Sequence, residues 1–194
     1  SLNPRMSVGE IIAEPLLIQK VGTPIWRRER AIELLERVGM AASAVDKFSF
    51  EFSGGQRQRI GVARAIALQP ELLVLDEPVS ALDVSVQSQV LNLLMELQDE
   101  MGIAYMFIAH DLAVVKHISD NVAVMYLGKV VELADADIIY KDPKHAYTKA
   151  LISAIPVPDP TAVKNSMILE GEIPSPINPP KGSAFGHRLN HPKY

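Results

Sequence analysis

The residues Ser53-Gly54-Gly55-Gln56 form a pattern that could bind a phosphate group. A serine that can cap a helix precedes two glycines, and the first N–H groups of a helix have no partner within the helix. Glycine lets an anion come close to the backbone, and the partly positive helix N-terminus favours it. For Ser-Gly-Gly alone, a glycine-rich helix start without a ligand is the simpler interpretation. The residues that follow in the chain favour the phosphate-binding interpretation instead.

Two carboxylates follow an apolar run of strand length. Leu72-Leu73-Val74-Leu75 precedes Asp76-Glu77-Pro78. Such a run predicts a buried strand of a parallel sheet, and ligands of open α/β sheets lie beyond the carboxyl ends of the strands. Adjacent strand residues point to opposite sides, so Asp76 and Glu77 can have different tasks. One can hold Mg²⁺, usually through water, and the other can orient or deprotonate an attacking water. The alternative, a solvated acidic loop, fits so apolar a run less well.

Two further segments lie close by in the chain. Ser80-Ala81-Leu82-Asp83 is by itself an ordinary helix cap. Phe107-Ile108-Ala109-His110-Asp111 ends a second apolar strand with a histidine. A single histidine in such a place is more often a hydrogen-bonded structural residue. Its expected position at the same sheet edge as Asp76 and Glu77 gives a catalytic interpretation equal weight.

The elements that must position these residues alternate between helix and strand. Caps and apolar periodicity predict helices over Ser7–Ile18, from Thr23-Pro24 to just before Gly39, near 42–47, and over 53–68, 83–101 and 111–118. The predicted strands are 72–75 and 104–108, both buried, and a hairpin of 122–126 and 129–133 around Leu127-Gly128. Helix, strand, helix, strand in this order predicts an α/β core, preceded by a small helical subdomain in residues 1–50.

Composition narrows the function classes. The 194 residues are 48% hydrophobic with a net charge of −4, which argues against a general nucleic-acid binder. There is no cysteine, so disulfides and thiolate metal sites are excluded within the sequence. No run of 18 apolar residues and no apolar signal core is present. Because the sequence starts without Met in a turn-like stretch, we expect it to be a piece of a longer chain. Eight of the 14 prolines lie from Pro156 to Pro192, which predicts an extended tail.

These motifs, in this order and with this short spacing, resemble the nucleotide-binding subunit of ABC transporters. The match runs through residues 50–111, and the four motifs together are highly specific. The sequence is closest to the peptide and nickel importer branch in Ser1-Leu2-Asn3-Pro4-Arg5, in Ser80–Ser85, in His145–Leu151 and in Ile155–Pro160. The resemblance covers essentially the whole chain.

The resemblance implies a role for each motif. Ser53, Gly54, Gly55 and Gln56 would contact the γ-phosphate of an ATP held by the opposite subunit, and Asp83 would lie in the loop that crosses the dimer interface. Residues 6–50 would belong to the helical subdomain that touches the membrane subunits.

The resemblance also implies the catalytic groups. Asp76 would be the strand-end carboxylate near Mg²⁺, and Glu77 would be the general base of hydrolysis. His110 would reach the γ-phosphate and link it to the attacking water.

Two features depart from the family pattern. No Gly-x-x-x-x-Gly-Lys-Ser/Thr loop, which would cradle the phosphates, occurs in the sequence, so we expect the isolated chain to bind ATP weakly or not at all and to be inactive. Many relatives carry cysteines in the tail where Ser183 and Leu189 stand, which argues against an iron–sulfur role for the tail.

The expected fold is therefore α/β, a partial ABC-type ATPase domain. It would comprise a helical subdomain (1–50), the signature helix with the C-terminal portion of the RecA-like core (51–133), C-terminal helices (134–155) and a proline-rich extension (156–194). Without the other half of the sheet, the strands at 72–75 and 104–108 would expose apolar edges.

The expected function is that of an ATPase subunit that energises an importer of oligopeptides or dipeptides. Its cofactors would be ATP and Mg²⁺, and its partners a second ATP-binding subunit, transmembrane permease subunits and, indirectly, a solute-binding protein, at the cytoplasmic face of the membrane. The alternatives are a non-catalytic fragment, or an ABC-type ATPase of DNA repair. The latter usually separates its motifs by a long coiled coil, for which no heptad run is present.

Overall fold

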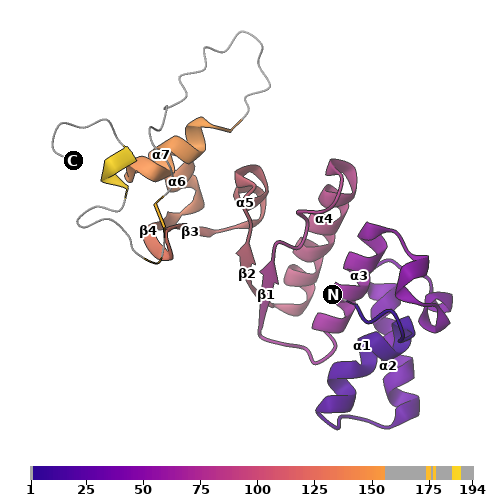
Figure 1. Ribbon diagram of the computed structural model, residues 1–194. Coiled ribbons are helices and arrows are strands. Elements are labelled where there is room, and N and C mark those ends of the chain that lie inside the picture. Colours follow the sequence, from indigo (N-terminus) through magenta and orange to yellow (C-terminus); the bar gives the residue numbers. More distant parts are fainter. Residues whose placement is uncertain (1, 156–173, 176, 178–184, 189–194) are drawn as a thin grey trace. The chain divides into compact units, whose positions relative to one another are not determined.

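The computed structural model describes residues 2–155, 174–175, 177 and 185–188 (Figure 1). The chain divides into two compact units, Ser1–Ala109 and His110–Tyr194. Ser53, Asp76, Glu77 and Asp83 belong to the first unit, whereas His110 is the first residue of the second. The expected tail lies almost wholly outside the described residues, as do Ser183 and Leu189.

The first unit begins with two helices whose starts follow from their caps. α1 (Val8–Ile18) starts with the predicted capping box, in which the Ser7 hydroxyl accepts from the N–H of Glu10 and the Glu10 carboxylate accepts from the N–H of Ser7. α2 (Pro24–Arg37) starts at Thr23 with Pro24 at its first position. Gly39 follows it with a φ of +73°, which only glycine adopts easily. Both predicted helices are confirmed.

Short helical turns and a long helix complete the helical part. η1 (Ala42–Asp46) and η2 (Ser49–Glu51) are 3₁₀-helices, and α3 (Gly54–Ala65) ends three residues earlier than predicted. The core lies where α1, α2 and α3 pack together. Its fully buried side chains include Val8, Ile12, Ala31, Leu34, Leu35, Val38, Ile60 and Ala63. The predicted apolar stripe of α2 is thus confirmed as core.

A strand–helix–strand segment follows. β1 (Leu72–Asp76) leads to α4 (Val84–Met101), and β2 (Ala104–Ile108) pairs with β1 in parallel, with Leu73 opposite Tyr105. Gly102 ends α4 with a φ of +65°. The Tyr105 hydroxyl donates to the Leu94 carbonyl oxygen at 2.8 Å, which ties β2 to α4. The predicted α/β order and the parallel pairing are confirmed.

The prediction that both strands are buried is wrong. Residues alternate along β1, where Leu73 and Leu75 are buried but Leu72 and Val74 are 53% and 55% exposed. On β2, Met106 and Ile108 are exposed on the same face. The sheet has two strands among the described residues, and only the face that packs toward α4 is covered. An apolar run indicates that both faces of a strand can be buried, but whether they are buried depends on which other elements cover them.

The second unit is built around the predicted hairpin. α5 (Leu112–Ile118) precedes β3 (Asn121–Tyr126) and β4 (Lys129–Asp135), which pair antiparallel. Leu127 and Gly128 both have positive φ, +48° and +74°, as a two-residue hairpin turn requires. α6 (Ala136–Lys141), α7 (Ala146–Ser153) and the 3₁₀-helix η3 (Gly186–Arg188) follow.

An aromatic cluster packs the second unit. Phe185 is 2% exposed, and its ring centroid lies 5.3 Å from those of both Tyr126 and Tyr147. Because Phe185 is far along the chain from the hairpin, it fixes this part of the tail against β3 and α7.

Candidate functional site

The Ser-Gly-Gly-Gln motif forms the start of α3. The Ser53 hydroxyl accepts from the N–H of Gln56 at 3.3 Å, and the Gln56 side-chain oxygen accepts from the N–H of Ser53 at 3.0 Å. This reciprocal capping box fixes the direction of the first turn. Ser53, Gly54 and Gln56 are exposed. An exposed helix start with a glycine at its first position offers backbone N–H groups to an anion without a side chain in the way.

The two glycines of the motif pack against the start of α4. A Cβ atom at Gly55 would lie 2.3 Å from Cγ1 of Val86, whereas one at Gly54 would lie 3.4 Å from Cδ2 of Leu82. Gly55 is buried. The absence of a side chain at Gly55 therefore lets the first turns of α3 and α4 approach closely. The structure thus brings Ser53–Gln56 together with the Leu82–Val86 segment.

Asp83 caps α4 beside this contact. Its carboxylate accepts from the N–H of Val86 at 3.0 Å and from the Ser85 hydroxyl at 2.8 Å. The hydrogen bond from the Val86 N–H, followed by that from Ser85, holds the pKa of the Asp83 carboxyl below its usual range. The interpretation of this residue as an ordinary helix cap is confirmed, and the capped helix start lies next to the glycine motif.

Asp76 and Glu77, which carry the two strand-end carboxylates, differ in backbone conformation. Asp76 is the last residue of β1 and is exposed. Glu77 lies beyond the strand with a φ of +46°, so the expectation that regular strand alternation separates the two side chains does not hold. Its N–H donates to the Ile108 carbonyl oxygen at 2.9 Å, and its own carbonyl oxygen accepts from the Ser80 hydroxyl at 3.1 Å. A left-handed conformation in a residue other than glycine costs about 1–3 kcal/mol, and Lys20, Gln69 and Leu127 adopt it as well.

His110 is exposed and stands two residues after the end of β2 in the chain. It begins the second unit, and the next residue, Asp111, caps α5 by accepting from the N–H of Ala113 at 2.8 Å. That His110 lies at the same sheet edge as Asp76 and Glu77 stays a prediction.

Three features of the site were missed by sequence reasoning. Leu82 and Val86 are the packing partners of the glycines, but a contact between residues some thirty positions apart leaves no local pattern. The left-handed backbone of Glu77 was also missed. Pro78, which follows it, was a local signal that the strand ends near this point, because proline has no N–H to donate to a neighbouring strand.

The described residues contain no group of three or more His, Asp or Glu side chains that could hold a metal ion on its own. Asp76 offers a single exposed carboxylate, the oxygen donor that Mg²⁺ prefers, and Mg²⁺ commonly takes only one or two protein carboxylates beside water and phosphate oxygens. In the described part of the chain, no helix is both long and apolar enough to cross a bilayer.

The α/β fold, the capped glycine motif and the strand-end carboxylates define a class, the ABC-type ATPases. Comparison with solved structures agrees. The chain matches the dimeric post-hydrolysis structure of the ATP-binding cassette MJ0796 bound to ADP and Pi with a TM-score of 0.61 and 28% identity, over 70% of this chain and 59% of that one. It also matches an inward-facing ABC transporter of metal-chelate type with a TM-score of 0.63 and 27% identity, over 69% of this chain and 54% of that one.

Family models and curated relatives indicate the branch of ABC transporters to which the chain is similar. Residues 1–80 match the ABC transporter family, and residues 131–191 match the C-terminal region of oligopeptide/dipeptide transporters. The oligopeptide transport ATP-binding protein OppF of Escherichia coli is 58% identical over 97% of this chain and 57% of its own length, and OppF of Salmonella typhimurium is 57% identical with the same shares. The chain belongs to the ABC transporter family, and it spans little more than half the length of these relatives.

Proposed function

We propose that the complete subunit containing this chain hydrolyses ATP to energise an importer of oligopeptides or dipeptides. Two OppF proteins carry oligopeptide transport in their names and are similar along 97% of the chain. The observation that carries the proposal is the close packing of the capped glycine motif against the start of α4, through Gly55 and Val86. This packing presents two helix starts at one surface, which suits a site for the terminal phosphate of a nucleotide.

Each predicted residue has a role in this proposal. Ser53, Gly54, Gly55 and Gln56 bind the γ-phosphate of an ATP whose other phosphates are held by a second subunit. Asp83 keeps the start of α4 in place at the interface between the two subunits. The exposed positions of Ser53, Gly54, Gln56 and Asp83 support these roles.

The chemistry falls to the residues that follow the two strands. Asp76 would hold Mg²⁺, and the ion would supply positive charge that offsets the charge of the phosphates. Glu77 accepts a proton from the attacking water, and its backbone is held by hydrogen bonds to Ile108 and Ser80. His110 hydrogen-bonds the γ-phosphate.

The partners follow from the same proposal. A second ATP-binding subunit, identical or related, completes each site, as in the relative whose structure is described as dimeric. The subunit lies at the cytoplasmic face of the membrane and moves transmembrane permease subunits, which receive peptides from a solute-binding protein.

The test uses the complete subunit with Glu77→Gln. Removing a general base slows the chemical step by about 10²–10⁴-fold, so we expect ATP turnover to fall by that factor while ATP binding stays unchanged. Glu71→Gln is the matched control, because Glu71 is an exposed glutamate just before β1. Turnover that is equal in the two variants would exclude the role of Glu77.

The isolated chain tests the alternative of a non-catalytic fragment. We expect no measurable ATP hydrolysis by the 194 residues alone, because they contain no loop that cradles phosphates. Hydrolysis by this chain would contradict that statement. A complete subunit that also fails to hydrolyse ATP would favour the assembly role over the ATPase.

A further inference from the structure

An arginine of α3 binds the C-terminal end of α2. The Nη1 group of Arg59 donates to the carbonyl oxygen of Val38 at 2.7 Å, and Val38 is the C-cap residue of α2. The last carbonyl groups of a helix have no partner within the helix and carry partial negative charge, so a guanidinium is a favourable partner for them. Because this hydrogen bond is partly buried and charge-assisted, it is a strong and directional contact between α3 and α2.

Gly39 leaves the room that this contact needs. A Cβ atom at position 39 would lie 2.9 Å from Nη1 of Arg59, which is closer than the two atoms can approach without a shift. The same glycine has a φ of +73°, the left-handed conformation that ends α2. A residue without a side chain therefore ends the helix and admits the guanidinium at the same place.

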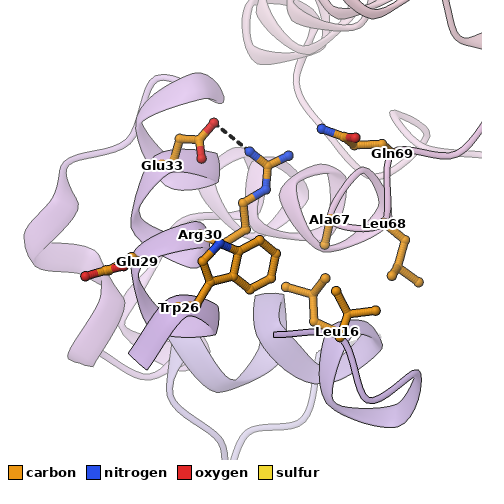
Figure 2. A pocket seen from close by; sticks show the side chains of 9 residues that line it. Leu16, Trp26, Glu29, Arg30, Glu33, Ala67, Leu68 and Gln69 are labelled. Carbon is orange, nitrogen blue, oxygen red and sulfur yellow. Dashed lines mark hydrogen bonds and ion pairs between the residues drawn. The ribbon is translucent and has the colours of Figure 1, made fainter. Parts of the chain in front are cut away.

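The opposite end of the contact between α2 and α3 is more open. Figure 2 shows Trp26 and Arg30 of α2 on one side of a pocket of about 470 Å³, and Ala67, just after α3, on the other. Apolar packing has no preferred direction, so it permits one helix to shift along another. A hydrogen bond has a preferred length and angle, so the bond from Arg59 fixes α3 along its axis.

Arg59 lies close to the capped glycine motif. It is six residues after Ser53 in the same helix, which is less than two turns. A regular helix moves as one piece over so short a distance, so a shift at Arg59 displaces the backbone N–H groups of 53–56 by the same amount. A displacement of about 1 Å in groups that contact a reacting phosphate can lower a rate by about 10²-fold.

We propose that Arg59 is a positioning residue of the ATPase, which fixes the place of the Ser53–Gln56 motif through its hydrogen bond to Val38. Arg59 does not touch the nucleotide and acts through α3. The proposal rests on the proposed function, because the motif meets a phosphate only in the complete subunit paired with a second one.

The test compares Arg59→Gln with Arg28→Gln in the complete subunit. Both are studied at equal ATP-binding stoichiometry, so that only folded subunits are counted. Arg28 is the matched control, because it pairs with Asp46 of η1 at 2.8 Å rather than with a group of α3. Arg59→Gln should lower kcat at least about tenfold and leave the KM for ATP within about threefold, since the affected contact is made with the reacting phosphate. Equal kcat in the two variants, or a loss confined to KM, would overturn the proposal.

Gly39→Asn displaces the guanidinium without changing Arg59, and it also covers the case in which Arg59→Gln does not fold. Asparagine tolerates a positive φ, so α2 can still end at this position while the new Cβ meets Nη1. This variant should lower kcat at least about threefold, and its combination with Arg59→Gln should be no slower than Arg59→Gln alone. Losses that multiply in the double variant would show two separate causes and refute the contact.

Hydrogen exchange separates failure of this proposal from failure of the proposed function, because exchange needs no nucleotide. An unsubstituted complete subunit without ATP turnover would exclude the proposed function. The N–H groups of Gln56 and Arg57 both donate to Ser53, and Arg59→Gln should speed their exchange at least about tenfold whereas Arg28→Gln should not. Unchanged exchange at the start of α3 would overturn the positioning role, whatever the turnover.

Discussion

Gly55→Ala tests whether the packing of α3 against α4 requires glycine. The added methyl group would lie 2.3 Å from Cγ1 of Val86, far inside the contact distance of two carbon atoms. Val86 is β-branched and stiff in a helix, so it cannot turn away cheaply. Overpacking of this kind costs about 1–3 kcal/mol, against which alanine regains up to about 1 kcal/mol of helix propensity.

Gly54→Ala is the matched control one residue away. Its methyl group would lie 3.4 Å from Cδ2 of Leu82, an acceptable contact, so we expect stability equal to or slightly above that of the unsubstituted chain. The two variants have the same composition and differ only in the site of one methyl group. We expect Gly55→Ala to be less stable than Gly54→Ala by about 1–3 kcal/mol.

The assay is equilibrium urea unfolding followed by circular dichroism at constant m-value. Val86→Ala, added to Gly55→Ala, should restore at least about 1 kcal/mol, because it removes the atom that the new methyl group meets. Equal midpoints for the two alanine variants, or no rescue by Val86→Ala, would refute the steric argument.

Three further predictions concern other parts of the chain. Phe185→Ala should destabilise the second unit by about 3–5 kcal/mol in urea unfolding, whereas Ile177→Ala, at an 85% exposed side chain, should have no effect. The pKa of the Asp83 carboxyl is lowered in the folded state. Its contribution to stability is therefore present above the pKa of the unfolded chain and is lost as the pH falls through the pKa of the folded state. Asp83→Asn should remove that part of the loss of stability with acid, measured by urea unfolding between pH 5 and pH 2. Glu77→Gly should stabilise the chain by about 1 kcal/mol in the same unfolding assay, since glycine adopts a φ of +46° without strain, and an unchanged midpoint would count against strain at this residue.

The sequence predicted what depends on local hydrogen bonds. The caps at Ser7, Thr23, Ser53 and Asp83 each accept from the backbone N–H three residues further on, so their signals lie within one turn. The hairpin turn at Leu127-Gly128 is equally local.

The sequence could not predict what depends on distant neighbours. The burial of β1 is decided by which elements cover its two faces, and an apolar run carries no such information. The contact between Gly55 and Val86 joins residues thirty-one positions apart. The sequence shows that position 55 is a glycine, but it does not show which residue leaves no room for a side chain there. The Arg30 side chain lies in a charged stretch of α2 and is nevertheless only 10% exposed, which the helix by itself does not predict.

The backbone of Glu77 links the fold to the proposed chemistry. A glutamate with a φ of +46° carries more backbone strain than a glycine at the same position. The surrounding structure nevertheless holds this conformation, through the bond to the Ile108 carbonyl oxygen and the bond from the Ser80 hydroxyl. The first of these bonds extends the β1–β2 pairing by one residue, so the position of Glu77 is tied to the sheet. A general base needs a carboxylate held in one place at a strand end, and a strained but firmly bonded glutamate meets that need where a glycine would not.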